Sequence, residues 1–150
     1  MTRAAREVLE DCRVAVQQLG GGTQGRAWRI QWVSAVVLLR AVGHVLNSID
    51  GKDPKYASAI ADAWDELKHS KPAPAIFWQF IETERNNIVK EYEIGAGQGV
   101  TVYLGQTRPA DNHYLINVGP YQGREQREVL AEAIAWWEEY LANIDKRAAG

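Results

Sequence analysis

Apolar residues recur every three or four positions along five stretches of the chain, which is the spacing of a buried helix face. The second stretch is apolar over most of its circumference, which is typical of a central helix with neighbours on several sides. The fourth and fifth stretches each end or begin near glycine-rich segments. The pattern therefore predicts five helices, over residues 4–19, 26–48, 54–68, 74–93 and 123–146.

Local signals support several of these boundaries. Asp53 can cap the third helix, with Pro54 at its first position. The segments GGGTQG (20–25) and GAGQG (95–99) are expected to end the first and fourth helices, because glycine readily leaves the helical conformation. Neither segment has the preceding strand and the Gly-Lys-Ser/Thr ending of a phosphate-binding loop.

Two short stretches between the fourth and fifth helices are rich in β-branched and aromatic residues. They are VTVYL (100–104) and YLINV (114–118), and the turn-forming sequence QTRPADN lies between them. This arrangement predicts a β-hairpin. The expected fold is mainly α, an antiparallel helical bundle of about five helices with a small β-hairpin before the last helix, in a single domain over residues 1–150.

Composition narrows the class of protein. The formal net charge is −2, so the whole chain lacks the basic field that attracts nucleic acid, although a local basic patch remains compatible. Cys12 is the one cysteine, which excludes an internal disulfide and fits a reducing compartment. The apolar run 33–46 is interrupted by Ser34, Arg40 and His44, so we expect no membrane span. The N-terminus lacks the apolar core of a secretory signal, and a cytoplasmic location is expected.

The fourth predicted helix carries charge beside its apolar face. A step of roughly 100° per residue puts Glu84 and Arg85 on the two flanks of the face centred on Ile81. A buried charge needs a partner, so Arg85 should contact a carboxylate, a carbonyl, an open groove or a second subunit. The sequence leaves two interpretations open: a structural ion pair with another helix, or a functional guanidinium.

The motif Arg85-Asn86, followed by Lys90 and Tyr92, resembles the signature helix of HEPN domains. In that family an Arg, often followed by Asn or another polar residue, precedes a His by four to six positions, and one branch adds a Tyr two positions further on. Lys90 stands here where the family has His. The resemblance covers about eight residues.

This resemblance implies a helical bundle that dimerises, and RNA as the substrate or ligand. Many such proteins are metal-independent ribonucleases of defence or toxin–antitoxin systems, while others are non-catalytic binding modules. The resemblance assigns catalysis to Arg85, with Asn86, Lys90 and Tyr92 as supporting residues. Arg suits a phosphate because its planar fork donates two hydrogen bonds. Lys90 could hold a phosphate, but it would act as a base only with a strongly lowered pKa.

Arg40 and His44 lie one helical turn apart on the second helix and are further candidates. They could form a basic groove for phosphate in which His44 replaces the missing proton carrier. Alternatively, they face solvent or pair with glutamates of the fourth helix. The three histidines and Cys12 show no metal-ligand spacing, so no metal and no cofactor are expected.

Trp136 and Trp137 are adjacent and cannot both point into one narrow core. Trp137 belongs to the buried stripe, and Trp136 is expected either in a wide core contact with the first helix or the hairpin, or against another subunit. Three hypotheses follow from the sequence. The first is a HEPN-like protein that acts on or binds RNA as a homodimer. The second is a non-catalytic regulatory module that binds a cognate protein partner. The third is a purely structural oligomer with no ligand.

Overall fold

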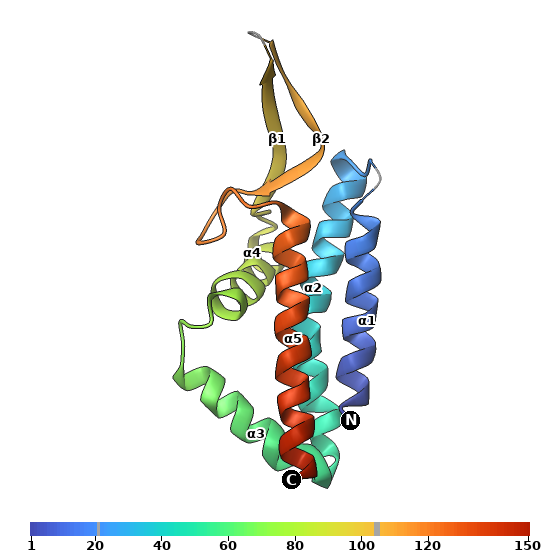
Figure 1. Ribbon diagram of the computed structural model, residues 1–150, viewed down its shortest axis with the longest axis vertical. Helices are drawn as coiled ribbons and strands as arrows, with labels where there is room; N and C mark the ends of the chain where they lie inside the picture. Colours follow the sequence, from blue (N-terminus) through green and yellow to red (C-terminus); the bar gives the residue numbers. More distant parts are fainter. Residues whose placement is uncertain (21, 104–105) are drawn as a thin grey trace.

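The computed structural model describes residues 1–20, 22–103 and 106–150, without the side chains of residues 99–113. Three long helices lie side by side, with both termini at one end and a two-stranded hairpin beyond the other end (Figure 1). α1 runs opposite to α2 and α5, and the shorter α3 packs on α5 at the end that holds the termini. The helices are α1 (Arg3–Gln18), α2 (Gly25–Ser48), α3 (Pro54–His69), α4 (Thr83–Glu91) and α5 (Gln126–Ala149).

This architecture confirms the mainly α fold, with the hairpin placed before the last helix. The start of α3 follows the predicted chemistry, since the Asp53 side chain accepts a hydrogen bond from the Lys55 amide at 2.9 Å and Pro54 is the first helical residue. α5 begins at Gln126, three residues later than predicted. There the Glu125 carboxylate accepts hydrogen bonds from the amides of Arg127 and Glu128 and caps the helix.

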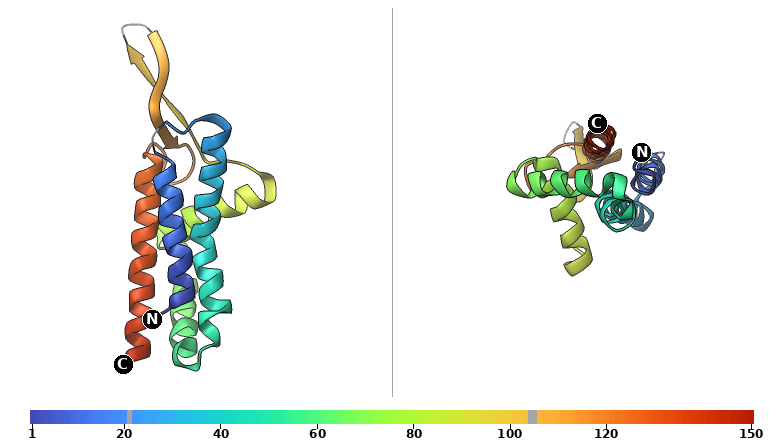
Figure 2. Two further views of the ribbon diagram at one scale, coloured as in Figure 1. Left: turned by 90° about the vertical axis from the view of Figure 1, so that its right-hand side faces the viewer. Right: turned by 90° about the horizontal axis from the view of Figure 1, so that it is seen from below.

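The fourth helix differs from the prediction. Residues Ile76–Glu82 form a π-helical segment, and the α-helical part covers only Thr83–Glu91. The wider π turn lets Phe77, Trp78, Phe80 and Ile81 all become buried. A uniform step of 100° per residue does not hold across such a segment. Together the π segment and α4 cross the long helices, and the far end of α4 projects beyond α2 (Figure 2).

The hairpin is longer than predicted. β1 (Ala96–Tyr103) and β2 (Gln106–Ile116) are antiparallel, with an irregularity in register between Gln98 and Val100. The expected helix stop GAGQG therefore lies largely within β1, and the expected turn QTRPADN lies within β2. Leu104, which the prediction placed in the first strand, is outside the described residues. Strand propensity depends strongly on context. Both strands of a two-stranded hairpin are edge strands, and edge strands tolerate Gly and Pro.

The hairpin is anchored to the bundle at its base. Tyr114 stacks on Trp28 with ring centroids 4.0 Å apart, and Ala96 and Ile116 are buried. The indole N–H of Trp28 in turn donates to the Gln126 side chain at 2.5 Å. These contacts join the start of α2, the hairpin and the start of α5. The base of the hairpin is thus fixed to the bundle between the starts of α2 and α5.

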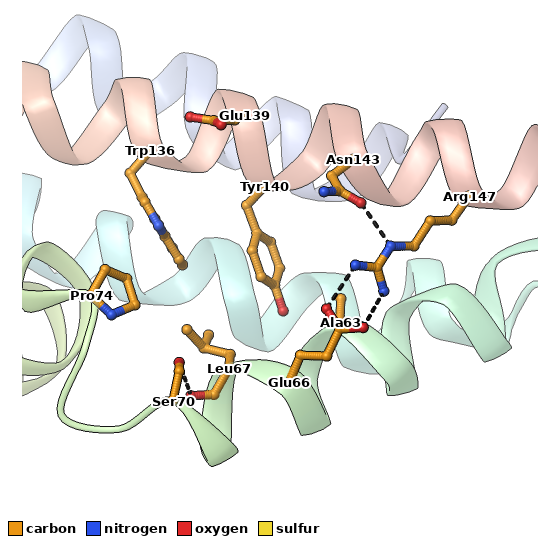
Figure 3. Close-up of a pocket in the computed structure, with 10 residues that line it drawn as sticks. All are labelled: Ala63, Glu66, Leu67, Ser70, Pro74, Trp136, Glu139, Tyr140, Asn143 and Arg147. Atoms are coloured by element: carbon orange, nitrogen blue, oxygen red, sulfur yellow. Dashed lines mark hydrogen bonds and ion pairs between the residues drawn. The ribbon is translucent and has the colours of Figure 1, made fainter.

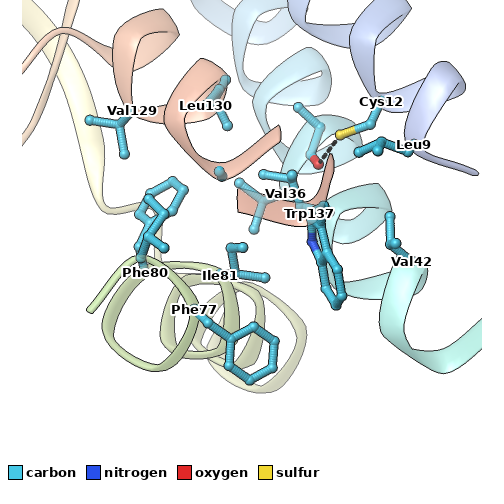
Figure 4. Packing of buried hydrophobic residues seen from close by; sticks show 14 of the residues in the cluster. Leu9, Cys12, Val36, Val42, Phe77, Phe80, Ile81, Val129, Leu130 and Trp137 are labelled. Carbon is cyan, nitrogen blue, oxygen red and sulfur yellow. Dashed lines mark hydrogen bonds between the residues drawn. The ribbon is translucent and has the colours of Figure 1, made fainter. Parts of the chain in front are cut away.

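α2 is the central helix, as predicted, and Figure 4 shows part of the core around it. Trp32, Val36 and Leu39 have no exposed surface. By length and mean hydropathy alone, the span Gly25–Lys52 would suffice to cross a membrane, a criterion that the central helix of a bundle also meets. Its apolar face packs against α1, α4 and α5, which accounts for its hydropathy within the bundle.

Trp136 packs within the chain. Its ring stacks on Phe77 of the π segment at 5.1 Å and on Tyr140 at 5.0 Å. The alternative that placed Trp136 against the first helix or the hairpin is therefore wrong, because the π segment occupies that side of α5. Trp137 lies in the core as predicted, with 1% of its surface exposed.

Candidate functional site

The crossing of α2 and α4 brings together residues that are about 40 positions apart in the sequence. α2 contributes Arg40 and His44, and the π segment and α4 contribute Glu82, Arg85 and Asn86. We call these five residues the α2–α4 cluster. It contains four of the six residues proposed from the sequence as catalytic or substrate-binding.

Arg40 is tied down inside the cluster. Its Nε donates to Glu82 Oε2 at 2.5 Å, and its guanidinium lies over the Phe77 ring at 5.6 Å from the centroid. Only 12% of the Arg40 side chain is exposed. The sequence left open whether Arg40 pairs with a glutamate of the fourth helix or opens to a ligand, and the structure has the pair with Glu82. The Arg40 side chain is thus held by its contacts with Glu82 and Phe77, which is a structural role.

Arg85 has a different environment. It is half-buried, and its Nη1 donates to Asn86 Oδ1 at 3.0 Å. Asn86 Nδ2 approaches Glu82 Oε1 at 3.4 Å, which holds the amide in place. Among the side chains that the structure describes, Arg85 forms no ion pair, so most of its guanidinium donors remain available. This geometry fits an anion-binding arginine better than a structural ion pair.

His44 is exposed and lies within electrostatic reach of both arginines. Partial burial, then the charges of Arg40 and Arg85, lower the pKa of His44 below its usual 6.5, and Glu82 opposes the change. The imidazole is therefore neutral at neutral pH, in the form that accepts a proton. The cluster thus combines a cation with donors to spare and a neutral base.

Glu84 lies apart from the cluster. It is 5% exposed, and both of its carboxylate oxygens accept from the Gly95 amide, at 2.9 and 3.2 Å. Burial raises the pKa of Glu84, while the Gly95 amide and the Trp32 indole oppose the rise. A Cβ at Gly95 would lie 2.6 Å from a Glu84 oxygen, so glycine is required for this close approach. Glu84 thus fastens α4 to the start of the hairpin.

Lys90 and Tyr92 lie further along the same segment and are exposed. No hydrogen bond or ion pair joins either side chain to the cluster within the described part of the chain. Tyr92 ends α4 in the left-handed conformation, at φ 52°, and the guanidinium of Arg29 lies 5.9 Å from its ring centroid. The structure therefore brings Arg85, Asn86, Arg40 and His44 together, and leaves Lys90 and Tyr92 at the rim.

One feature of this surface was not predicted. Three large apolar side chains, Ile30, Val37 and Val89, are exposed on α2 and α4, by 54, 37 and 57% respectively. Helical spacing could have identified these residues, since Ile30 and Val37 share one face of α2 with His44. The pair of Arg40 with Glu82, in contrast, was one of the alternatives that the sequence left open, together with pairs to Glu84 or Glu91.

The remaining histidines do not extend the site. His69 Nδ1 lies 2.7 Å from the Asp65 carbonyl oxygen at the end of α3, and the side chain of His113 is outside the described residues. No group of three or more His, Cys, Asp or Glu side chains that could hold a metal is present among the described residues.

Comparisons of this chain with protein-family models, curated proteins and solved structures gave no match. The HEPN resemblance therefore rests on the motif in α4 and on the residues around it. The chemistry of the α2–α4 cluster is the basis for assigning a function.

Proposed function

We propose that this protein is a HEPN-like, RNA-acting protein that binds the RNA backbone at the α2–α4 cluster and cleaves it without a metal. The observation that carries the proposal is the crossing of α2 and α4 at the Arg40–Glu82 pair, where His44 lies within electrostatic range of Arg85, an arginine with donors to spare. Neither group alone would suffice, since cleavage needs both a proton acceptor and a charge that stabilises the phosphate.

In this mechanism neutral His44 accepts the proton of a ribose 2′-OH. The 2′ oxygen attacks the adjacent phosphorus, and the bond from phosphorus to the 5′ oxygen breaks as that oxygen takes up a proton from water. The products are a 2′,3′-cyclic phosphate and a 5′-hydroxyl end. Arg85 donates to the non-bridging oxygens as charge builds on them, and Asn86 holds the guanidinium. His44 thus takes the role that the family gives to the residue at the position of Lys90.

Lys90 and Tyr92 have supporting roles. Lys90 is exposed one turn beyond Asn86, where its charge would attract the neighbouring phosphates of a bound strand. Tyr92 is 55% exposed, and Arg29 lies against its ring, so a base could stack there. We place both residues on the path of the RNA, away from the bond that is cleaved.

We further propose that the protein acts as a homodimer through the surface around the cluster. Ile30 and Val37 are exposed on the face of α2 that carries His44, Val89 is exposed one turn after Arg85 on α4, and a two-fold contact would cover them in both copies. Such a contact would also bring two Arg85 side chains towards one groove.

The same exposed side chains favour the second candidate function, a non-catalytic module that binds a cognate protein. In that case Ile30, Val37 and Val89 form the core of the interface, and Arg85 pairs with an acidic residue of the partner. The two functions differ in one respect, since only the first requires His44.

The test compares RNA binding and cleavage by four purified proteins in the presence of EDTA. Arg85→Ala should weaken RNA binding and reduce cleavage at least about 100-fold, which is the typical effect of losing a charge-stabilising donor. His44→Gln should reduce cleavage by a similar factor but leave binding within about twofold. Arg3→Ala, which removes an exposed cation from the start of α1, is the matched control and should change neither.

Stability separates a functional arginine from a structural one. Because Arg85 forms no ion pair among the described side chains, Arg85→Ala should change the free energy of unfolding by less than about 1 kcal/mol. Arg40→Ala strands the Glu82 carboxylate and should cost about 1–3 kcal/mol. Equal cleavage by the wild type and His44→Gln would reject the catalytic proposal, and RNA binding unaffected by Arg85→Ala would reject RNA as the ligand of this cluster.

A further inference from the structure

A pocket of about 450 Å³ lies between α3 and α5, on a different side of the π segment from the α2–α4 cluster. Figure 3 shows Trp136 and Tyr140 projecting from α5 towards α3, with Pro74 facing Trp136. The α3 side includes the small side chains Ala63 and Ser70, which leave the space between the helices unfilled. The volume is within the range of sites for small molecules.

The aromatic wall of this pocket is held rigidly. Trp136 stacks on Tyr140, with centroids 5.0 Å apart and planes 28° apart, and on its other neighbour Phe77 at 5.1 Å. Because Phe77 and Tyr140 both stack on Trp136, its two faces are covered, and a ligand in the pocket contacts the edge of Trp136 and the face of Tyr140 turned away from it. Burial raises the pKa of Tyr140 to about 12, and its hydroxyl stays neutral at physiological pH.

The one cation in the pocket wall is already neutralised. Arg147 donates to both Glu66 oxygens, at 2.9 and 2.7 Å, and its Nε donates to Asn143 at 2.7 Å. A bidentate pair of this kind is strong, so an anionic ligand would have to displace Glu66.

The Glu139 carboxylate, by contrast, lines the pocket without an ion-pair or hydrogen-bond partner among the described side chains. The wall therefore carries one uncompensated negative charge next to two aromatic rings. A wholly apolar ligand would desolvate this carboxylate without replacing its water contacts. An organic cation would satisfy both features, because ring faces and carboxylates each attract positive charge.

We propose that the pocket between α3 and α5 binds a small organic cation of the alkylated ammonium class, which lies against the ring of Tyr140 with Glu139 as its counter-ion. This site is separate from the α2–α4 cluster and does not depend on the RNA function.

The test uses three probes of nearly equal shape: choline, the neutral 3,3-dimethylbutan-1-ol and the anionic 3,3-dimethylbutanoate. Each has nine equivalent methyl protons, whose proton NMR signal moves upfield when the group lies over an aromatic ring. Titration of the full chain gives a Kd for each probe. Choline should bind at least about tenfold more tightly than the neutral analogue, and the anion more weakly still.

Glu139→Gln should weaken choline binding at least about fivefold and bring its Kd close to that of the neutral analogue. Tyr140→Leu should weaken the binding of choline and remove most of the upfield shift. Tyr140→Phe keeps the ring and should keep both the binding and the upfield shift. Glu128→Gln, an exposed change on the same helix outside the pocket, should leave binding unchanged.

Three results would each overturn the proposal. The first is equal affinity for choline and its neutral analogue. The second is choline binding that Glu139→Gln leaves unchanged in a folded protein. The third is the absence of any methyl shift with choline at millimolar concentrations.

Discussion

Glu84 and Arg85 are neighbours on α4, but their side chains lie in opposite environments. Glu84 is buried against the Gly95 amide, and Arg85 is half-buried beside Asn86 with donors to spare. The wide π turn that precedes them sets this difference, because it brings the Glu84 side of α4 towards the hairpin and the Arg85 side towards His44. One residue therefore has a structural role, and its neighbour is the candidate for function.

The raised pKa of Glu84 gives a pH-dependent prediction. A carboxyl group whose pKa is raised on folding contributes stability that is fully present below its unfolded pKa, near 4.5, and is lost as the pH rises through the folded pKa. Glu84→Gln keeps an acceptor for the Gly95 amide and does not ionise. We expect this variant to gain stability relative to the wild type as the pH is raised from below 4.5 to about 7.

Urea unfolding at several pH values measures this effect. Glu84→Ala is the companion variant, since it leaves the Gly95 amide without its acceptor and should cost about 1–3 kcal/mol. If the difference between wild type and Glu84→Gln stays constant from acid to neutral pH, the buried carboxyl is not responsible for the predicted change.

At the scale of elements, local sequence signals predict where helices begin, but they do not predict the π segment Ile76–Glu82 that crosses the long helices. Asp53 and Pro54 predict the start of α3, because capping depends on residues within one turn. The π segment buries Phe77, Trp78, Phe80 and Ile81 together. The apolar spacing in the sequence does not predict this packing, because the spacing is read with the period of a regular α-helix. The pair of Arg40 with Glu82 joins residues 42 positions apart, so the sequence could offer this pair as one alternative but could not choose it over Glu84 or Glu91.

The hairpin should be separable into an anchored base and a dispensable arm. Tyr114, Ala96 and Ile116 hold the base against the bundle. Replacing residues 99–113 by Asn-Gly joins the paired residues Gln98 and Tyr114 through a two-residue turn. This change should alter the free energy of unfolding by less than about 1 kcal/mol, because isolated hairpins are only marginally stable.

Tyr114→Ala, in contrast, removes the stack on Trp28 and should cost about 3 kcal/mol or more. Circular dichroism during urea unfolding measures both variants. Loss of cooperative unfolding in the shortened protein would show that the arm is needed for the fold of the bundle.

At the scale of the whole molecule, two candidate sites share one aromatic residue. Phe77 has the Arg40 guanidinium over its ring and Trp136 stacked beside it, so it lies between the α2–α4 cluster and the α3–α5 pocket. The pocket was not predicted from the sequence, because it arises from the way α3 diverges from α5.

The proposed homodimer is tested by sedimentation at micromolar concentration. We expect the wild type to be a dimer and Val89→Glu to be a monomer, because a charge at this exposed position would be buried in the contact. Val14→Glu is the matched control: Val14 is 46% exposed on α1, away from the cluster, and this variant should remain a dimer. A monomeric wild type would contradict the proposed homodimer.

The central claim is that Arg85 and His44 form one anion-binding site, and the pKa of His44 tests it most directly. Proton NMR titration of the imidazole should give a pKa below 6.5 in the wild type. In Arg85→Ala the pKa of His44 should rise, because a nearby positive charge that opposes protonation is removed. A 2′-O-methyl RNA oligonucleotide, which lacks the attacking hydroxyl, should raise it in the wild type and have less effect in the variant. A His44 pKa that is identical in the two proteins, with and without the oligonucleotide, would contradict the account.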